Sequence, residues 1–451
     1  MEKELFGTDG IRGVAGQPPL DLATVFAVGL SLGQLLRRKA ARGNVILGED
    51  TRESSHWIAE TVAAGLQETA REVVGVGVIT TPGLAYLTAS ENFAAGIMIS
   101  ASHNPYQDNG IKIIASTGFK LPEEDELEIT RQVCRMLGDG SAPQSYALSV
   151  PANPRLVNRY VDFLRRAAGP SWSLPGWKLI LDCANGSASA IAKEVFSGYG
   201  LEVRFLGDRP NGQNINLHCG SLHMETLQEA VLREKADLGA ALDGDADRAL
   251  FVAANGHLVN GDGILWAASR SMREHGTLQG GAVVGTVMTN LGLEHALARE
   301  GLKLLRTPVG DKYVLDEMLR SGANLGGEQS GHIIFRDLAT TGDGLLTVLQ
   351  VLRLLAERKR PLEELVDGLK FFPQTIRNVR VREKAPLESL PQVIEQIQAG
   401  EKRLGSSGRL LVRYSGTESL VRVMVEAESA EEVEQVASAI ARALEESLGA
   451  S

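Results

Sequence analysis

The chain has 451 residues, 43% of them hydrophobic and 23% charged, and its 46 Lys and Arg against 56 Asp and Glu leave a formal net charge of −10. This length exceeds what one compact core usually holds, and the apolar content excludes a mainly disordered or fibrous chain. The acidic balance argues against nucleic-acid binding, which depends on clustered Lys and Arg. We therefore expect a soluble protein of several domains.

The start of the chain and its apolar stretches predict a cytoplasmic location. The first four residues, MEKE, lack the apolar core of a signal peptide, and charged residues or glycines interrupt every long apolar stretch before it reaches membrane-spanning length. The three cysteines, Cys134, Cys183 and Cys219, show neither CxxC spacing nor the density of a disulfide-rich domain. We expect reduced thiols and no membrane partner.

Helical and strand-like patterns alternate through the first third of the chain. In chain order they are a helix over 21–38, a strand at 45–47, a helix over 55–70 and strands at 73–79, 95–100 and 111–115. This order is typical of an α/β domain with a mostly parallel sheet, which we place at 1–150. GLSLG at 29–33 matches the hydrolase pattern GxSxG, but it lies inside a helical pattern, so we do not interpret it as a nucleophile.

The same rhythm recurs twice, which predicts α/β domains at 151–254 and 255–367. The second run has helices over 156–168 and 188–197 and strands at 178–182, 201–206 and 237–242. The third has strands at 282–287, 302–307 and 324–326, helices after Leu291 and Asp311, and a long helix over 344–358.

The last eighty or so residues predict a smaller α+β domain at 368–451. Three stretches, 375–381, 409–414 and 419–427, alternate like antiparallel strands, and SAEE at 429–432 is a capping-box signal for a final helix. The apolar face of that helix consists of Val433, Val436, Ile440, Leu444 and Leu448. The expected fold is three successive similar α/β domains with mixed, mostly parallel sheets, followed by this domain.

Ser102 lies on a turn where the strand pattern at 95–100 ends, and Pro105 keeps Asn104 out of helical conformation. Ligands meet parallel sheets at the carboxyl ends of their strands, so this hydroxyl is placed to act as a nucleophile or phosphoryl acceptor. Taken alone, the position favours a serine that only satisfies turn amides.

The sequence LDGDADR at 242–248 is a sharper signal. Asp243, Asp245 and Asp247 follow an apolar strand and would repel one another strongly without a cation. Hard oxygen ligands favour magnesium over zinc. An EF-hand is excluded because Arg248 and Ala254 stand where its glycine and bidentate glutamate belong. The alternative is an acidic, solvated turn.

Two further loops have the chemistry of ligand recognition. RYSGTE at 413–418, with Arg422 beyond it, offers hydroxyls, free amides and guanidiniums for a phosphate; a tight hairpin with surface arginines is the alternative. GGEQSGH at 326–332 offers polar groups between glycines for a polyhydroxy ring, or is a polar loop with a surface His. Lys112 is either a solvated lysine or a proton carrier with a depressed pKa near Ser102.

Five motifs in this order resemble the phosphohexomutase superfamily. They are FGTDGIRG at 6–13, SHNP at 102–105, DGDADR at 243–248, GEQSGH at 327–332 and RYSGTE at 413–418, and they extend over nearly the whole chain. The resemblance implies three similar α/β domains and a smaller fourth domain around a central cleft.

The resemblance also implies roles for individual residues. Ser102 would carry the transferable phosphoryl group, and one Mg²⁺ would be held by Asp243, Asp245, Asp247 and an oxygen on Ser102. Arg248 and Arg12 would act in the reacting site, with Lys112, His103 and His332 as candidates for proton transfer. Substrate would be bound by Glu328, Ser330, Gly310, Arg413, Ser415, Gly416, Thr417 and Arg422.

The activity that the resemblance implies is interconversion of glucosamine 6-phosphate and glucosamine 1-phosphate through a phosphoserine enzyme and a bisphosphorylated sugar, feeding amino-sugar nucleotide and cell-wall precursor synthesis. Gln329 in the sugar loop favours glucosamine over glucose or mannose phosphates, which stay as the alternative. A phosphatase that uses Asp243 as nucleophile and a noncatalytic sugar-phosphate sensor are two further alternatives. The chain would act as a monomer or homodimer.

Overall fold

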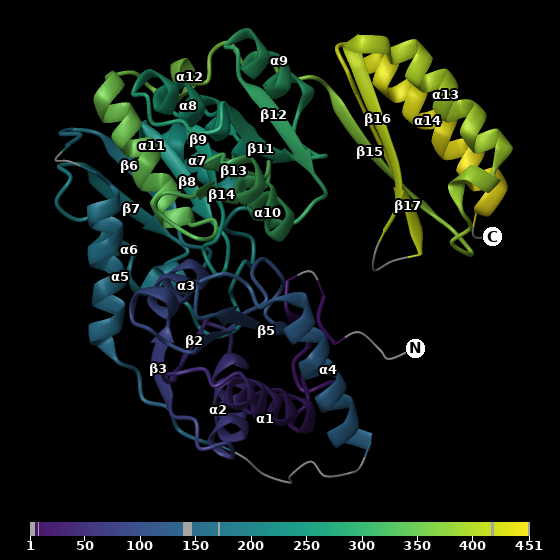
Figure 1. Cartoon of the computed structure of the whole chain (residues 1–451). Coiled ribbons are helices and arrows are strands. Elements are labelled where there is room, and N and C mark those ends of the chain that lie inside the picture. Colours follow the sequence, from purple (N-terminus) through teal and green to yellow (C-terminus); the bar gives the residue numbers. More distant parts are fainter. Residues whose placement is uncertain (1–4, 8, 139–146, 170–171, 416–418, 450–451) are drawn as a thin grey trace. The chain divides into compact units, whose positions relative to one another are not determined.

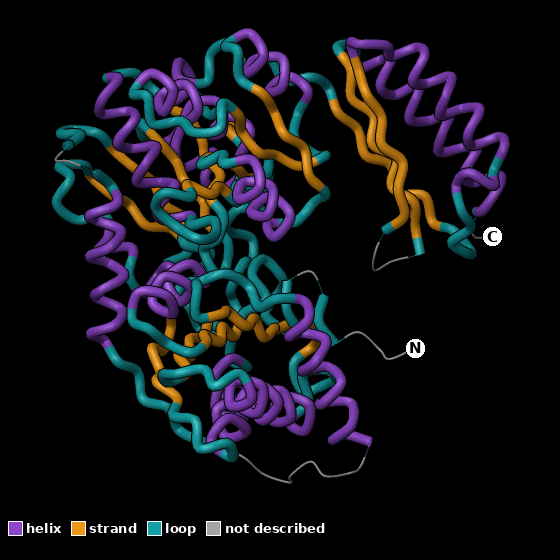
Figure 2. Tube along the Cα trace, in the orientation of Figure 1, coloured by secondary structure: helices purple, strands orange, loops and turns teal. Residues whose placement is uncertain are grey.

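The computed structural model describes residues 5–7, 9–138, 147–169, 172–415 and 419–449. The chain divides into two compact units, one made of residues 1–287 and 305–366 and the other of 288–304 and 367–451. The first unit contains most of the sheets (Figures 1 and 2). Among the described residues, no helix is both long and apolar enough to cross a membrane.

The first sheet has the strand order β1-β5-β4-β2-β3. Its strands are β1 (Ile11–Val14), β2 (Val45–Glu49), β3 (Val73–Val78), β4 (Ala95–Ile99) and β5 (Asp108–Ala115). β2 runs parallel to β3 and β4, whereas β5 runs antiparallel to β4 and β1. Its helices are α1 (Leu22–Arg38), α2 (Ser55–Gln67), α3 (Thr81–Ser90) and α4 (Glu123–Gly138).

The GxSxG pattern lies inside α1, as expected, and its first glycine has a packing role. A Cβ atom on Gly29 would lie 2.1 Å from the carbonyl oxygen of Val62 in α2, and one on Gly65 would lie 2.2 Å from that of Phe26. α1 and α2 therefore approach so closely that only glycine fits at either position.

The second sheet has the order β10-β9-β8-β6-β7, with β6 parallel to β7 and β8 and the other pairs antiparallel. Its strands are β6 (Lys178–Asp182), β7 (Glu202–Leu206), β8 (Leu238–Leu242), β9 (Ala249–Ala253) and β10 (Leu258–Val259). Its helices are α5 (Pro154–Ala167) and α7 (Glu225–Glu234). Where one helix over 188–197 was expected, the chain forms the 3₁₀ turn η1 (Ser187–Ala190) and the short α6 (Ala192–Val195).

The third sheet has the order β12-β11-β13-β14, in which β11 and β13 are parallel. Its strands are β11 (Ala282–Thr286), β12 (Lys303–Thr307), β13 (Leu325–Gly327) and β14 (Ile333–Phe335). The helices α8 (Gly261–Glu274), α10 (Asp311–Ser321), α11 (Gly344–Arg358) and α12 (Leu362–Leu365) also belong to the first unit. Each large sheet thus combines parallel pairs with one or two strands paired antiparallel, as the mixed α/β expectation requires.

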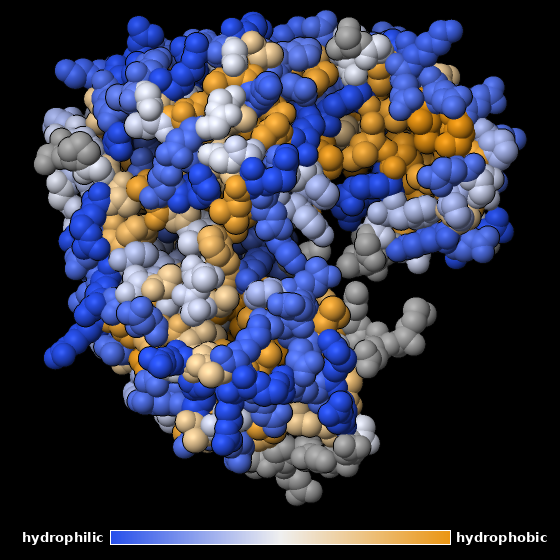
Figure 3. Space-filling model, viewed as in Figure 1, coloured by the Kyte–Doolittle hydropathy of each residue, from blue (hydrophilic) through white to orange (hydrophobic). Residues whose placement is uncertain are grey.

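The second unit contains the antiparallel sheet β15-β17-β16. Its elements are β15 (Gln374–Arg380), β16 (Gly408–Tyr414), β17 (Leu420–Ala427), α9 (Leu291–Arg299), α13 (Pro391–Leu404), α14 (Ala430–Leu448) and the 3₁₀ turns η2 (Leu387–Ser389) and η3 (Gly405–Ser407). The five apolar residues predicted for the last helix are all buried in its core, and Ser429 accepts a hydrogen bond from the Glu432 amide. On the face in Figure 3, apolar residues gather between β16 and α13.

Several helices were not predicted from the sequence. α3 is buried along most of its length, so it has no polar face to produce a helical period. The three cysteines are free, as expected, and Cys183 and Cys219 are buried.

Candidate active site

Ser102 sits on the turn that follows β4 and is almost completely buried, with 1% of its surface exposed. Its φ of 53° is left-handed, which few residues other than glycine adopt without support. The support comes from hydrogen bonds: the Ser102 amide donates to Ser100 Oγ at 3.0 Å, and its carbonyl accepts from Arg52 and Asn216, both at 2.9 Å. The sequence predicted the turn but neither of these two side chains.

Arg52 is the principal brace of this turn. Its guanidinium donates to Asp50 Oδ2 at 2.9 Å and to the carbonyl oxygens of Pro105 at 2.6 Å, Ser102 at 2.9 Å and Asn104 at 2.9 Å. A planar fork of donors suits several fixed acceptors at once. Arg52 follows β2, and no local pattern in the sequence connects it with a turn 50 residues away.

Asp243, Asp245 and Asp247 lie between β8 and β9, are all buried, and bring their carboxylate oxygens within 4.8 Å of one another. Ser102 Oγ donates a hydrogen bond to Asp243 Oδ2 at 2.7 Å. Burial, and then the charges of Asp247 and Asp245, raises the pKa of Asp243 well above its usual value.

These carboxylates fit a divalent cation. Within the described part of the chain, Asp245 Oδ1 and Asp247 Oδ1 are buried and accept no hydrogen bond. Buried carboxylate oxygens are normally paired, so these two have the chemistry of ligands for a hard cation such as Mg²⁺. Ser102 and the three aspartates, which the sequence analysis assigned to one cation site, thus lie together in the structure.

Lys112 is locked between two carboxylates, Asp245 Oδ2 at 2.8 Å and Asp9 Oδ2 at 3.0 Å. Burial alone would lower its pKa, but Asp245 and Asp9 outweigh burial and raise it above the usual value. The depressed pKa considered for Lys112 is therefore not what the structure shows. Lys120 continues the chain of charges by binding Asp9 and Asp311, each at 2.7 Å.

His103 lies beside the Ser102 hydroxyl and also contacts Arg248. His103 Nδ1 is 3.3 Å from Ser102 Oγ and 3.2 Å from an Arg248 nitrogen. Burial, and then the charges of Arg248 and Arg12, lowers the pKa of His103 to about 4. An Arg248 N–H that points at Nδ1 requires a lone pair there, which agrees with a neutral imidazole.

Arg12 braces the same turn from β1. Its guanidinium donates to the Ala101 carbonyl at 3.1 Å and to Asn104 Oδ1 at 3.3 Å, and it pairs with Asp9. Asp9 thus joins Arg12, Lys112 and Lys120 in one ionic network. The sequence contained a signal for Asp9, because it stands in the same 6–13 motif as Arg12.

The loop after β13 brings His332 to the metal loop, residues 243–247. His332 Nδ1 lies 3.6 Å from Asp247 Oδ2, and the Gly342 amide donates to Nε2 at 3.0 Å. Burial would lower the pKa of His332, but Asp247 raises it to about 9. The Gly342 amide can only donate, so Nε2 must offer a lone pair, and on that ground we assign the neutral Nδ1–H tautomer in spite of the raised pKa.

Glu328 and Ser330 lie on the same loop. Glu328 Oε1 accepts a hydrogen bond from the Gly310 amide at 3.0 Å, which joins two of the predicted substrate-binding residues. Ser330 Oγ is buried and has no hydrogen-bond partner among the described residues, as expected of a group that awaits a ligand.

In the second unit, Arg413 and Arg422 face each other across the β16–β17 ladder. Ser415 is buried, and its carbonyl accepts a hydrogen bond from Lys384 Nζ at 2.7 Å. Lys384 is a third cation that the sequence did not indicate. The predicted residues Gly416 and Thr417 lie outside the described residues.

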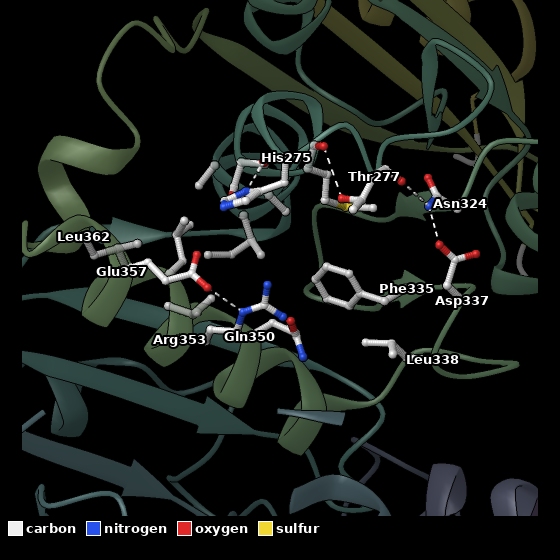
Figure 4. Close-up of a pocket in the computed structure, with 17 residues that line it drawn as sticks. His275, Thr277, Asn324, Phe335, Asp337, Leu338, Gln350, Arg353, Glu357 and Leu362 are labelled. Carbon is white, nitrogen blue, oxygen red and sulfur yellow. Dashed lines mark hydrogen bonds and ion pairs between the residues drawn. The ribbon is translucent and has the colours of Figure 1, made fainter. Parts of the chain in front are cut away.

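Two cavities of the first unit differ in their relation to these groups. One of about 260 Å³ adjoins the site, and its lining includes Asp9, Lys112, Lys120, Asp247 and Asp311. The other, of about 210 Å³, lies between α8 and α11 and is lined mainly by apolar side chains (Figure 4). It contains none of the predicted site residues, whereas Lys112 and Asp247 line the first cavity.

Four family models match the chain in order: phosphoglucomutase/phosphomannomutase alpha/beta/alpha domain I at residues 3–136, domain II at 158–256, domain III at 260–371 and the C-terminal domain at 377–443. The chain belongs to the phosphoglucomutase/phosphomannomutase family. A protein of this family from Solibacter usitatus (strain Ellin6076), named phosphoglucosamine mutase, is 50% identical over 449 residues, which cover 100% of both chains. Another of that name, from Koribacter versatilis (strain Ellin345), is 50% identical over 454 residues and covers 99% of this chain and 98% of its own.

Solved structures of the family share the fold. A phosphoglucomutase/phosphomannomutase family protein from Burkholderia thailandensis superposes with a TM-score of 0.80 at 23% identity, over 99% of this chain and 98% of that one. The N-acetylphosphoglucosamine mutase of Aspergillus fumigatus, solved in complex with GlcNAc-6P and magnesium, gives a TM-score of 0.67 at 20% identity, over 98% of this chain and 95% of that one. The resemblance noted from the five motifs is therefore confirmed.

Proposed function

We propose that this protein is an isomerase that interconverts glucosamine 6-phosphate and glucosamine 1-phosphate, and so supplies a precursor of amino-sugar nucleotides. The observation that supports it most directly is the contact between Ser102 Oγ and Asp243 Oδ2, because it joins a phosphoryl-acceptor hydroxyl to a cation site. The full-length relatives named phosphoglucosamine mutase support this sugar over glucose or mannose. A cytoplasmic location and domain boundaries near residues 150, 254 and 367 belong to the same proposal.

The reaction begins with phosphorylated Ser102. A sugar hydroxyl attacks phosphorus, a new O–P bond forms, and the bond between phosphorus and Ser102 Oγ breaks. The bisphosphorylated sugar then reverses its orientation, and Ser102 takes back the other phosphoryl group. Mg²⁺, held by Asp243, Asp245, Asp247 and an oxygen on Ser102, would neutralise charge on the phosphoryl oxygens.

The side chains of the site divide the remaining work. His103, with Nδ1 3.3 Å from Ser102 Oγ, is our candidate for moving the hydroxyl proton. Lys112 and Arg248 are fixed cations beside the transferred group. Glu328, Ser330 and Gly310 would bind the sugar, and Arg413, Ser415, Gly416, Thr417 and Arg422 would hold the phosphate that is not reacting.

The decisive experiment combines intact-mass measurement and peptide mapping with a glucosamine-phosphate assay in magnesium. We expect one phosphoryl group on Ser102 and near-complete loss of isomerisation in Ser102→Ala. A phosphatase that uses Asp243 would instead keep its activity in Ser102→Ala and release phosphate. Faster turnover of glucose or mannose phosphates than of glucosamine phosphates would contradict the proposed sugar.

A further inference from the structure

A buried phenol in α5 connects two segments that are far apart in the sequence. Tyr160 is completely buried, and its hydroxyl accepts a hydrogen bond from Thr80 Oγ1 at 3.2 Å and donates one to Asp343 Oδ2 at 2.8 Å. Gly83 makes room for the ring, since a Cβ there would lie 2.7 Å from Tyr160 Cε1. Burial and Asp343 raise the pKa of Tyr160 well above its usual value, so the hydroxyl keeps its proton.

The residue after Thr80 holds one side of the metal loop. The Thr81 amide donates to the Asp245 carbonyl at 3.0 Å, and Thr81 Oγ1 donates to Asp245 Oδ2 at 2.5 Å. A shift of the Thr80 backbone would therefore move both the backbone and the carboxylate of Asp245.

The residues on either side of Asp343 hold the other side of that loop. The Gly342 amide donates to His332, which faces Asp247, and the Gly344 amide donates to the Ala246 carbonyl at 2.9 Å. Asp343 itself caps α11 by accepting from the Leu346 amide at 3.0 Å, which fixes where Gly342 and Gly344 point.

We propose that Tyr160 is a positioning residue for the metal loop, whose hydroxyl ties together the segments that hold Asp245 and Asp247. It touches neither carboxylate and acts through Thr80 and Asp343. Groups that orient metal ligands from behind commonly change metal affinity roughly 10-fold or more when they are removed. The inference rests on the metal site of the proposed function and adds to it the residue that sets the spacing of the ligands.

The ring alone offers a competing explanation. Tyr160 packs near Tyr86 and Phe163, with ring centroids 6.1 and 6.2 Å away, so the residue could serve only as part of the core. That role would make the hydroxyl matter for folding stability but not for metal affinity. Metal affinity therefore separates the two roles.

The test measures Mn²⁺ binding to the full, unphosphorylated chain by the electron paramagnetic resonance signal of free Mn²⁺. We expect Tyr160→Phe to bind Mn²⁺ roughly 10-fold more weakly than the wild type. Tyr86→Phe is the matched control: it removes a hydroxyl from the same aromatic cluster that has no hydrogen bond to any described residue, and its affinity should be unchanged.

The possible results are distinct. Equal Mn²⁺ affinity in Tyr160→Phe and the wild type overturns the inference and leaves the proposed function standing. A wild-type chain that binds no Mn²⁺ overturns the metal site and the inference together. If Tyr160→Phe does not fold, the test uses Thr80→Val, which removes the hydroxyl that donates to Tyr160. Weaker Mn²⁺ binding by Thr80→Val than by Thr80→Ser supports the inference, and equal Mn²⁺ binding overturns it.

Discussion

Ser102 Oγ lies 2.7 Å from Asp243 Oδ2, although 141 residues separate the two in the chain. Ser102 follows strand β4 of the first sheet, and Asp243 follows strand β8 of the second. Each residue taken alone has a simpler interpretation. The serine could only satisfy the backbone amides of its turn, and the aspartate could belong to a solvated acidic loop. Their contact, buried beside two more carboxylates, is the basis on which we propose a phosphoryl-transfer site.

Removing one charge from the aspartate trio should have opposite effects on the metal-free and metal-bound protein. We expect Asp243→Asn to raise the melting temperature of the metal-free protein, because mutual repulsion and burial already raise the pKa of Asp243. The same change should weaken Mg²⁺ binding at least about 10-fold, since it weakens one of the proposed ligands. Differential scanning calorimetry with and without Mg²⁺ measures both effects. Asp162→Asn, on an exposed position of α5, is the control and should change neither.

Arg52 should matter for the rate more than its distance from the reacting atoms suggests. Its guanidinium reaches four acceptors around Ser102, which the point charge of a lysine cannot reproduce. Misplacement of a reacting group by about 1 Å can cost on the order of 100-fold in rate, and we expect kcat to fall by that order in Arg52→Lys. Arg71→Lys is the matched control for Arg52→Lys, because Arg71 also donates hydrogen bonds to loop carbonyls, those of Ala41 and Gly43. A wild-type kcat in Arg52→Lys would contradict this role.

Asp343 should make stability depend on pH. Burial raises its pKa to about 6, so between about pH 4 and 6 the folded protein holds a proton that the unfolded chain releases. Its contribution to stability is therefore complete below pH 4 and is lost as the pH rises through 6.

The measurement compares Asp343→Asn with the wild type by urea unfolding from pH 4 to 7. Asn does not titrate, so the free energy of unfolding of the variant should rise relative to the wild type by roughly 2–3 kcal/mol across this range. The altered hydrogen bond to Tyr160 lowers stability by the same amount at every pH and leaves the slope intact. Asp316→Asn, at an exposed position, is the control and should show the wild-type dependence of unfolding free energy on pH. If Asp343→Asn shows that same pH dependence, the raised pKa of Asp343 is refuted.

Lys384 should contribute to substrate binding in the second unit. Its ammonium contacts the Ser415 carbonyl at 2.7 Å, beside the predicted phosphate loop. Since a distal phosphate is bound in the ground state and the transition state alike, Lys384→Met should raise KM roughly 10-fold and leave kcat nearly unchanged. Lys402→Met, in the last turn of α13, removes the same charge from the same unit and should have little effect on either constant. An unchanged KM in Lys384→Met would exclude the role.

Most of the fold could be predicted because its signals are local. The strand pattern at 178–182 and the helix pattern at 344–358 match β6 and α11 residue for residue, since periods of two and 3.6 depend only on near neighbours. α3 could not be found this way, because it is covered on nearly all sides and shows no period. The Asp243, Asp245 and Asp247 spacing was likewise readable, because three carboxylates directly after an apolar strand favour a cation site over a solvated turn.

What only the tertiary structure decided is the state of each group. Lys112 keeps its proton because two carboxylates lie against it, those of Asp9 and Asp245. These residues are 103 and 133 positions away from Lys112 along the chain. Arg52, Asn216 and Tyr160 carry no motif and acquire roles only through the carbonyls and hydroxyls that folding brings to them. Sequence determines which chemical groups are present, and a pKa, a tautomer or a ligand set depends on burial and on neighbours that are distant in the chain.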